Sequence, residues 1–355
     1  MTTVVVSSFD VANYPEGGGH FWVYMQYVQA LRGLGCDVWW LEQFRPWKDP
    51  DRNAQVLAAF RNRLERFGLG NRALLYAIEP TTQADARVAF LTAPPQEAQS
   101  ILRRADLVLN FHYGIDPRLL SGARRTALVD IDPGLTQLWM SNGQIQVPPH
   151  DVYFTIGETV GTPDATFPDC GLTWLHIHPP VCLDLWPYVH DPRCTTFTTV
   201  AGWWSGKWVK VKEEGREVCH DNNKRIAFLA REVASSPDAY QAYIQQSRGE
   251  WSCAKPFFVK LQNAWVSDRT TCYLASGKPV VVQHTGPSDY LPHGEGMFRF
   301  RTTADAAAAL DAINSDYPRH CRAAREIAEA HFDARRILSG ILDTALAPAT
   351  QALRA

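Results

Sequence analysis

The sequence of 355 residues lacks the motifs that identify several common classes of protein. None of its eight cysteines has the C-x-x-C spacing of a redox or zinc motif, so we expect reduced thiols. Residues 1–10 have no basic region leading into an apolar stretch, and they predict no signal peptide. No run reaches the roughly 18 apolar residues that span a bilayer. These absences predict a soluble, cytoplasmic protein without stable membrane insertion.

The sequence also has almost no net charge. Its 35 Lys and Arg are balanced by 37 Asp and Glu, which leaves a formal charge of -2. Proteins that bind extended nucleic acid need a basic surface to offset the phosphate backbone. We therefore expect no nucleic-acid partner, although a local basic site for a single diphosphate remains compatible with this balance.

The sequence does contain the pattern of a two-domain α/β protein. Its length exceeds the size at which one hydrophobic core usually stops growing. A strand at residues 4–6, a glycine-rich loop, a helix at 21–34 and a strand at 37–42 form a βαβ unit. Further strands are expected at residues 73–78, 107–111, 126–131 and 152–156, and a surface helix at 52–67.

A proline-rich stretch at residues 175–192 is the best domain boundary, because closely spaced prolines break both helices and strands. We expect one domain at residues 1–178 and a second at 179–335, followed by a C-terminal helix at 336–355. The elements expected beyond the boundary are strands at 195–204 and 279–283, a helix at 226–232, and helices with two breaks over 304–346.

Three consecutive glycines, Gly17, Gly18 and Gly19, stand between the first strand and the first helix. Glycine lets backbone N–H groups approach an anion at a helix N-terminus, which makes this loop a candidate phosphate site; a tight turn alone also explains it. His20 follows, at the carboxyl end of a parallel strand, where open α/β sheets place ligands. We interpret His20 as a capping residue or as a catalytic general base. The loop is neither a G-x-G-x-x-G fingerprint nor a Walker A motif.

The most specific signal lies in the second half. A helix expected from about Asp268 leads through Ala-Ser-Gly into a buried strand. The run Leu-Ala-Ser-Gly-Lys-Pro-Val-Val at residues 274–281 resembles the A-S-G-x-P-V-V element of GT-B glycosyltransferases. The resemblance covers about residues 245–345.

This resemblance implies an α/β fold of two facing, doubly wound, Rossmann-like domains. It implies that the first domain binds the acceptor and the second binds a nucleotide-sugar donor, with the C-terminal helix packing back toward the first domain. The loop at Thr285 and Gly286 resembles the one whose backbone meets the donor.

The sequence departs from the family at two positions. Many retaining members carry two glutamates separated by seven residues, and the register of the motif puts Ala264 and Cys272 there. Retention of configuration therefore does not carry over. Asp268 lies one helical turn before Cys272. It is a candidate to accept hydrogen bonds from hydroxyl groups of the donor, or to cap the N-terminus of the helix. Arg269 is a candidate to form an ion pair, either with a phosphate of the donor or with a nearby carboxylate.

Basic residues near this motif are candidates to neutralise a diphosphate without a metal. Arg248 and Lys255 stand seven residues apart around a glycine and two serines, and Lys207 follows the first strand of the second domain. On the acceptor side, Asp132 ends a buried strand at its carboxyl edge. Trp22 belongs to a set of aromatic residues that favours a small, flat acceptor.

We expect no metal and no cofactor. His176 and His178 lie on one strand face, but no third ligand completes a zinc site. Asp130 and Asp132 have a D-x-D spacing, yet no acidic group besides this pair is evident to complete a metal site.

The function that these features favour is a metal-independent, inverting glycosyltransferase with a small-molecule acceptor. His20 would act as the base. A sugar-nucleotide epimerase or hydrolase on the same fold, a dinucleotide-dependent oxidoreductase and a non-catalytic nucleotide-sugar sensor remain alternatives. The oligomeric state, the sugar and the nucleobase do not follow from the sequence.

Overall fold

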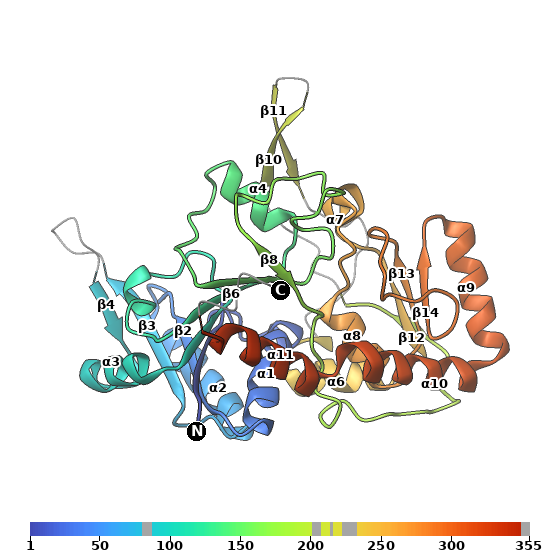
Figure 1. Ribbon diagram of the computed structural model, residues 1–355. Helices are drawn as coiled ribbons and strands as arrows, with labels where there is room; N and C mark the ends of the chain where they lie inside the picture. The colour runs from blue at the N-terminus through green and yellow to red at the C-terminus, as the bar shows by residue number, and fades with distance from the viewer. Residues whose placement is uncertain (80–86, 201–206, 214–215, 222–232, 349–355) are drawn as a thin grey trace. The chain divides into compact units, whose positions relative to one another are not determined.

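The computed structural model describes residues 1–79, 87–200, 207–213, 216–221 and 233–348 (Figure 1). The chain forms two compact units. The first consists of Met1–Val129, Val147–Val152 and Leu338–Ala355, and the second of Asp130–Gln146 and Tyr153–Ile337. The division into functional domains at residue 178 stays a prediction.

The first sheet has eight strands in the order β4-β3-β2-β1-β5-β6-β7-β8. β1 pairs in parallel with β2 on one side and with β5 on the other, so the strand order reverses beside β1. Ligands of open α/β sheets bind at the carboxyl ends of strands where such a reversal occurs. The strands are β1 (Thr3–Ser7), β2 (Asp37–Gln43), β3 (Ala73–Glu79), β4 (Arg87–Phe90), β5 (Leu107–Asn110), β6 (Thr126–Asp130), β7 (Val152–Thr155) and β8 (Trp174–His176).

Helices cover both faces of the strands of the first unit. Neighbouring side chains of a strand point to opposite faces, so Trp39 and Trp40 of β2 contact different helices. Trp39 of β2 belongs to the core that includes α3 (Pro95–Arg104). Trp40 packs on Phe21 of α1 (Gly18–Gly33) and on Phe60 of α2 (Pro50–Arg66). The remaining helical segments before β7 are η1 (Pro117–Leu119) and α4 (Leu135–Ser141).

The second sheet is smaller and entirely parallel, in the order β14-β13-β12-β9. Its strands are β9 (Phe197–Thr198), β12 (Gly249–Ser252), β13 (Val280–Gln283) and β14 (Met297–Phe300), while β10 (Lys207–Glu213) and β11 (Arg216–Asp221) form a separate antiparallel pair. The helices of this half are α6 (Pro237–Gln245), α7 (Pro256–Leu261), α8 (Asp268–Ala275), α9 (Thr303–Ser315), α10 (Tyr317–Ile327), the π-helical turn η2 (Ala328–Phe332) and α11 (Ala334–Leu346).

The sequence predicted the strongest of these elements correctly. The motif 274–281 joins α8 to β13, and Gly277 has the positive φ of 68° that a helix C-terminus favours. Of the strand expected at 195–204, only Phe197–Thr198 is a strand among the described residues. The helix expected at 226–232 lies outside them. Elements that sequence patterns did not predict include β4, β10, β11, β12, β14, α3, α4 and α6.

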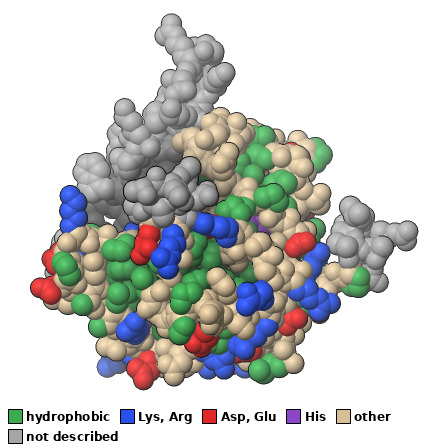
Figure 2. All heavy atoms as spheres, turned by 90° about the vertical axis from the view of Figure 1, so that its left-hand side faces the viewer, with side chains coloured by type: hydrophobic (Ala, Val, Ile, Leu, Met, Phe, Trp, Pro, Cys, Tyr) green, Lys and Arg blue, Asp and Glu red, His purple; other side chains and the backbone are tan. Residues whose placement is uncertain are grey.

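Charge is mixed on the side of the molecule that carries β4 and α3. Figure 2 shows Lys and Arg side chains there scattered among acidic and hydrophobic ones, without a large patch of one sign. No helix in the described ranges is both long enough and apolar enough to cross a bilayer. The seven cysteines whose side chains the structure describes are free thiols.

Candidate functional site

A pocket opens at the carboxyl edge of the second sheet, where β12 and β13 end and α8 begins. Open α/β sheets bind ligands at this edge. Its lining residues come from the two strand ends, from the loop before α8, from the first turn of α8 and from β14: Ser252, Cys253, Ala254, Trp265, Val266, Ser267, Arg269, Thr270, Val282, Gln283, Thr285, Leu291, Met297 and Arg299.

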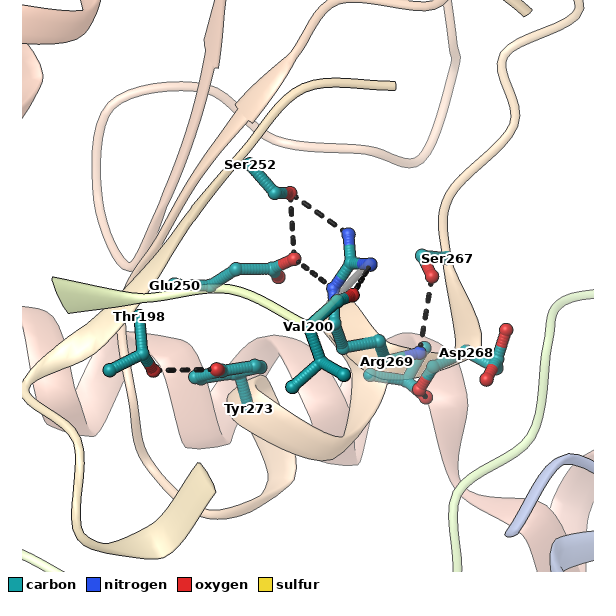
Figure 3. A network of polar contacts seen from close by, with 9 residues as sticks. Thr198, Val200, Glu250, Ser252, Ser267, Asp268, Arg269 and Tyr273 are labelled. Carbon is teal, nitrogen blue, oxygen red and sulfur yellow. Dashed lines mark hydrogen bonds and ion pairs between the residues drawn. The ribbon is translucent and has the colours of Figure 1, made fainter. Parts of the chain in front are cut away.

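A buried ion pair stands at this pocket (Figure 3). Arg269 Nε donates to Glu250 Oε1 at 2.7 Å, and the two side chains are 11% and 0% exposed. Ser252 Oγ joins them, since it donates to Glu250 Oε1 at 2.7 Å and accepts from Arg269 Nη2 at 3.0 Å. Burial is the largest single influence and lowers the pKa of Arg269, but the Glu250 carboxylate and further neighbouring groups together raise this pKa above its usual value. Of the two roles predicted for Arg269, the structure shows pairing with a carboxylate.

The N-terminus of α8 borders the same pocket. Ser267 caps the helix, because its side chain accepts a hydrogen bond from Arg269 N at 3.3 Å. The prediction of Asp268 as the N-cap is therefore wrong; Asp268 occupies the first turn, where an acidic side chain favours the helix dipole. Burial raises the pKa of the Asp268 carboxyl. Cys272 and Ala264, which replace the family's glutamates, are both buried.

Two predicted site residues from distant parts of the chain meet in the second unit. Lys255 Nζ donates to Asp132 Oδ1 at 2.9 Å, with the side chains 27% and 23% exposed. Lys255 precedes α7, directly after the pocket residue Ala254, and Asp132 follows β6. The structure thus joins a residue predicted for the donor to one predicted for the acceptor.

Asp130, beneath this pair, is a structural residue. Its carboxylate accepts hydrogen bonds from Thr136 Oγ1 at 2.7 Å, from Gln137 Nε2 at 2.9 Å and from Thr155 Oγ1 at 2.9 Å. Burial raises its pKa. No group of three His, Cys, Asp or Glu within the described ranges is arranged to hold a metal ion.

Arg248 does not lie beside Lys255. It precedes β12 and Lys255 follows it, so the strand separates them, with Arg248 at the amino edge of the sheet. Its guanidinium is held there by Asn314 Oδ1 at 2.6 Å and lies 4.0 Å from the centre of the Tyr317 ring. The side chain of Lys207 lies outside the described part of the structure.

Thr285 and Gly286 pack on the chain before α8. Thr285 Oγ1 donates to Trp265 O at 2.6 Å, and Ala264 N donates to Thr285 O at 3.0 Å. A Cβ on Gly286 would lie 2.4 Å from Gln262 O, and its φ is 140°. Close packing between backbone segments therefore explains this glycine.

Replacing Gly286 by alanine is expected to lower the free energy of unfolding by about 1–3 kcal/mol more than the same change at Gly294. Gly294 is the matched control, because its φ of 123° is also positive but a Cβ there would have nothing within 4 Å. Urea unfolding of both variants measures the difference. Equal losses would show that backbone strain, and not the clash with Gln262, requires the glycine.

In the first unit, the three glycines begin α1. Gly17 is the N-cap, and Gly18 and Gly19 lie in the first turn, followed by His20. His20 Nε2 donates to Phe9 O at 2.6 Å, because a carbonyl oxygen only accepts. The neutral imidazole therefore carries its lone pair on Nδ1. Trp22 was predicted to contact the acceptor. It is 3% exposed and packs on Phe67, so the structure places it in the core.

Polar groups that sequence patterns did not reveal lie where β1 and β5 end. Asn110 Nδ2 lies 3.1 Å from His150 Nε2, and His112 stands 4.9 Å, between ring centres, from the half-exposed Phe9. His112 is 7% exposed, and its Nδ1 has no hydrogen-bond partner within the described chain. Burial, with help from Arg45, lowers the pKa of His112 to about 4. The signal available was the position of Asn110 at the end of the predicted strand at 107–111 and of His112 directly after it.

Comparisons with known proteins agree with this architecture. No family model matches the sequence, and no curated protein matches it. HepE of Anabaena, solved in complex with UDP, is 11% identical, with a TM-score of 0.50 over 97% of this chain and 99% of that chain. The same protein with UDP-glucose gives 11% identity and a TM-score of 0.47 over the same shares of the chains. A glycosyltransferase of Rickettsia africae gives 9% identity and a TM-score of 0.41 over 99% of both chains.

At 11% identity the likeness to HepE supports the fold alone, and the two lower TM-scores add no weight. The chain has two Rossmann-like α/β units built on parallel sheets, the GT-B type of fold that the motif at 274–281 predicted.

Proposed function

We propose that this protein is a glycosyltransferase that moves a sugar from a nucleoside diphosphate-sugar to a small-molecule acceptor. The observation that carries the proposal is the ion pair of Lys255 and Asp132, which lies after the carboxyl ends of β12 and β6, beside a small pocket at the edge of the second sheet. The structurally similar HepE was solved in complex with UDP, which supports a nucleotide-linked sugar as the donor. The proposed location is the cytoplasm.

The pair of Lys255 and Asp132 suits the binding and release of a diphosphate. Both side chains are about one quarter exposed, and ion pairs of this kind are weak and exchangeable. A diphosphate offers the ammonium stronger, charge-assisted hydrogen bonds. Asp132 is then released to accept a hydrogen bond from a sugar hydroxyl. The N-terminus of α8 at the pocket supplies further donors.

We propose a metal-independent, inverting reaction. His20 Nδ1 accepts the proton of the acceptor as its oxygen or nitrogen forms the bond to the anomeric carbon. The bond from that carbon to the diphosphate breaks, and the departing negative charge is stabilised by Lys255. The hydrogen bond from His20 Nε2 to Phe9 O fixes the orientation of the ring and favours the imidazolium that forms.

The experiment that tests the function measures release of nucleoside diphosphate from UDP-, GDP-, ADP- and dTDP-glucose with a panel of small acceptors in the presence of EDTA. Thermal-shift titrations with the four nucleoside diphosphates and with NAD accompany it. Sugar transfer to an acceptor supports the proposal. Binding of NAD alone would favour an oxidoreductase, and release of the sugar without transfer, or its isomerisation, would favour the hydrolase or epimerase.

Lys255→Ala is expected to weaken binding of the preferred nucleoside diphosphate by about 10- to 150-fold, since one charged hydrogen bond is worth about 1.5–3 kcal/mol. Binding of the nucleoside without phosphates should change little. Calorimetric titrations measure both affinities. Lys260→Ala is the matched control, because Lys260 is an exposed lysine on α7, the helix that Lys255 directly precedes. Equal diphosphate affinity in the two variants would remove Lys255 from the site.

A further inference from the structure

A groove next to the pocket is lined by basic side chains that sequence patterns did not single out. His284 follows β13, while Arg299 lies on β14 and Arg301 follows it. The groove is completed by His293, Phe298 and three residues of α9, Asp305, Ala308 and Ala309. Basic side chains at the carboxyl ends of β13 and β14 therefore lie together in this groove.

His284 is approached by more N–H donors than a neutral imidazole accepts. Gly286 N donates to its Nδ1 at 3.1 Å, which places the ring proton on Nε2. Arg301 Nη2, which only donates, lies 2.9 Å from that same Nε2. Two N–H groups therefore face each other across this contact, and neither finds an acceptor in the other.

His293 adds a further donor to the groove. Its Nδ1 accepts from Arg299 N at 3.1 Å, so its Nε2 carries the ring proton. Among the described residues, neither Arg299 nor Arg301 forms an ion pair with a carboxylate. The groove is rich in donors and poor in acceptors.

The carboxylates near the groove are engaged elsewhere. Asp305 accepts from Arg301 N at 3.1 Å and from Thr302 N at 2.9 Å, as part of the cap of α9. Glu158 accepts from Ser288 Oγ at 2.7 Å. Burial lowers the pKa of Arg299, and the Glu158 carboxylate opposes this. The guanidinium charges are therefore only partly offset.

We propose that this groove binds a phosphate group, whose oxygens accept hydrogen bonds from Arg301 and from His284 Nε2. A phosphate has enough acceptor oxygens for both histidine N–H groups and both guanidinium groups, and it supplies the negative charge that the groove lacks. The N-terminus of α9, a helix of 13 residues, favours an anion at the same place. This site is separate from the pair of Lys255 and Asp132, and the proposal does not depend on glycosyl transfer.

The test uses inorganic phosphate and protein labelled with carbon-13 at histidine. Ring signals are followed by NMR during titration, with sodium chloride adjusted to hold ionic strength constant, because exposed charges are screened by salt. The signals of His284 and His293 should shift in a saturable way. Burial, followed by Arg299, Arg301 and His293, holds the pKa of His284 at about 4, and bound phosphate should raise it.

Arg301→Ala should weaken phosphate binding about tenfold or more, because a charged hydrogen bond is lost. Arg319→Ala is the matched control, since Arg319 is an exposed arginine that pairs with Glu295 outside the groove. It should bind phosphate as the wild type does. If Arg301→Ala binds phosphate as tightly as the control, or if the histidine signals do not shift, the proposal is wrong.

The same variants distinguish the source of the phosphate. A tenfold loss of UDP affinity in Arg301→Ala would identify the nucleotide donor as the source, and unchanged UDP affinity would identify a separate phosphorylated compound. Both results keep the phosphate site. Absence of binding of all four nucleoside diphosphates by the wild-type protein would count against the proposed function and leave the titration with inorganic phosphate valid.

Discussion

Arg269→Met is expected to lower the free energy of unfolding by about 3–5 kcal/mol, because it leaves a buried carboxylate without its counter-charge. Glu250 is 0% exposed, and its Oε2 already has no hydrogen-bond partner within the described chain. After the substitution, only the Ser252 hydroxyl would donate to the Glu250 carboxylate among the contacts shown in Figure 3. Methionine keeps much of the volume, so the loss reports the charge more than a cavity.

A double-mutant cycle separates the pair from its surroundings. Glu250→Gln removes the buried negative charge, so Glu250→Gln with Arg269→Met should be more stable than the sum of the single losses predicts. Arg193→Ala is the surface control. Arg193 pairs with Asp191, but its side chain is 89% exposed, so the substitution should change the free energy of unfolding little. Urea unfolding measures all four variants. A loss at Arg269 no larger than at Arg193, or strictly additive losses in the cycle, would contradict a buried, coupled pair.

The fold could be predicted where local signals were strong. Gly277 follows the end of α8 and Pro279 precedes β13, and both residue types indicate a break between elements. Three consecutive valines then indicate the buried strand itself. The βαβ unit at the start of the chain is marked in the same way by Val4–Val6 and Gly35. These features act between neighbouring residues, so the sequence displays them directly.

The position of Arg248 shows why other parts could not be predicted. Arg248 was grouped with Lys255 because the two stand seven residues apart, and Gly-Glu-Trp-Ser between them has neither the alternation nor the apolar run of a typical strand. Those residues form β12, and a strand extends the chain by about 3.3 Å per residue. The two charges therefore lie at opposite edges of the sheet.

The ion pairs of the candidate site depend on contacts that no local pattern encodes. Asp132 and Lys255 meet across 123 residues of sequence. Glu250 and Arg269 come from a strand and from a helix that pack together only in the folded protein. A buried glutamate also contradicts the usual exposure of charged residues, so it is recognised only once its partner is seen.

His20→Ala is expected to lower the rate of sugar transfer by about 10²–10⁴-fold, the usual effect of removing a positioned general base. The hydrogen bond from Nε2 to Phe9 O assigns the ring proton of the neutral imidazole to Nε2, so in the proposed role Nδ1 takes up the proton. His20 also lies in the first turn of α1, after β1, beside which the strand order reverses. Donor affinity should be nearly unchanged, because the proposed donor contacts involve other residues.

Two controls distinguish a base from a structural histidine. His20→Gln has a side-chain N–H that can still donate to Phe9 O, but it cannot accept a proton near neutral pH, so it should be as slow as His20→Ala. His176→Ala removes a histidine with the same kind of contact, from Nε2 to Val160 O at 2.8 Å, and should keep normal turnover. Turnover and nucleoside diphosphate affinity are measured for each variant, together with the anomeric configuration of the product. Near-normal turnover of His20→Gln would show that the residue only orders the loop through Phe9, and a product that retains the configuration of the donor would exclude direct attack by an acceptor that His20 deprotonates.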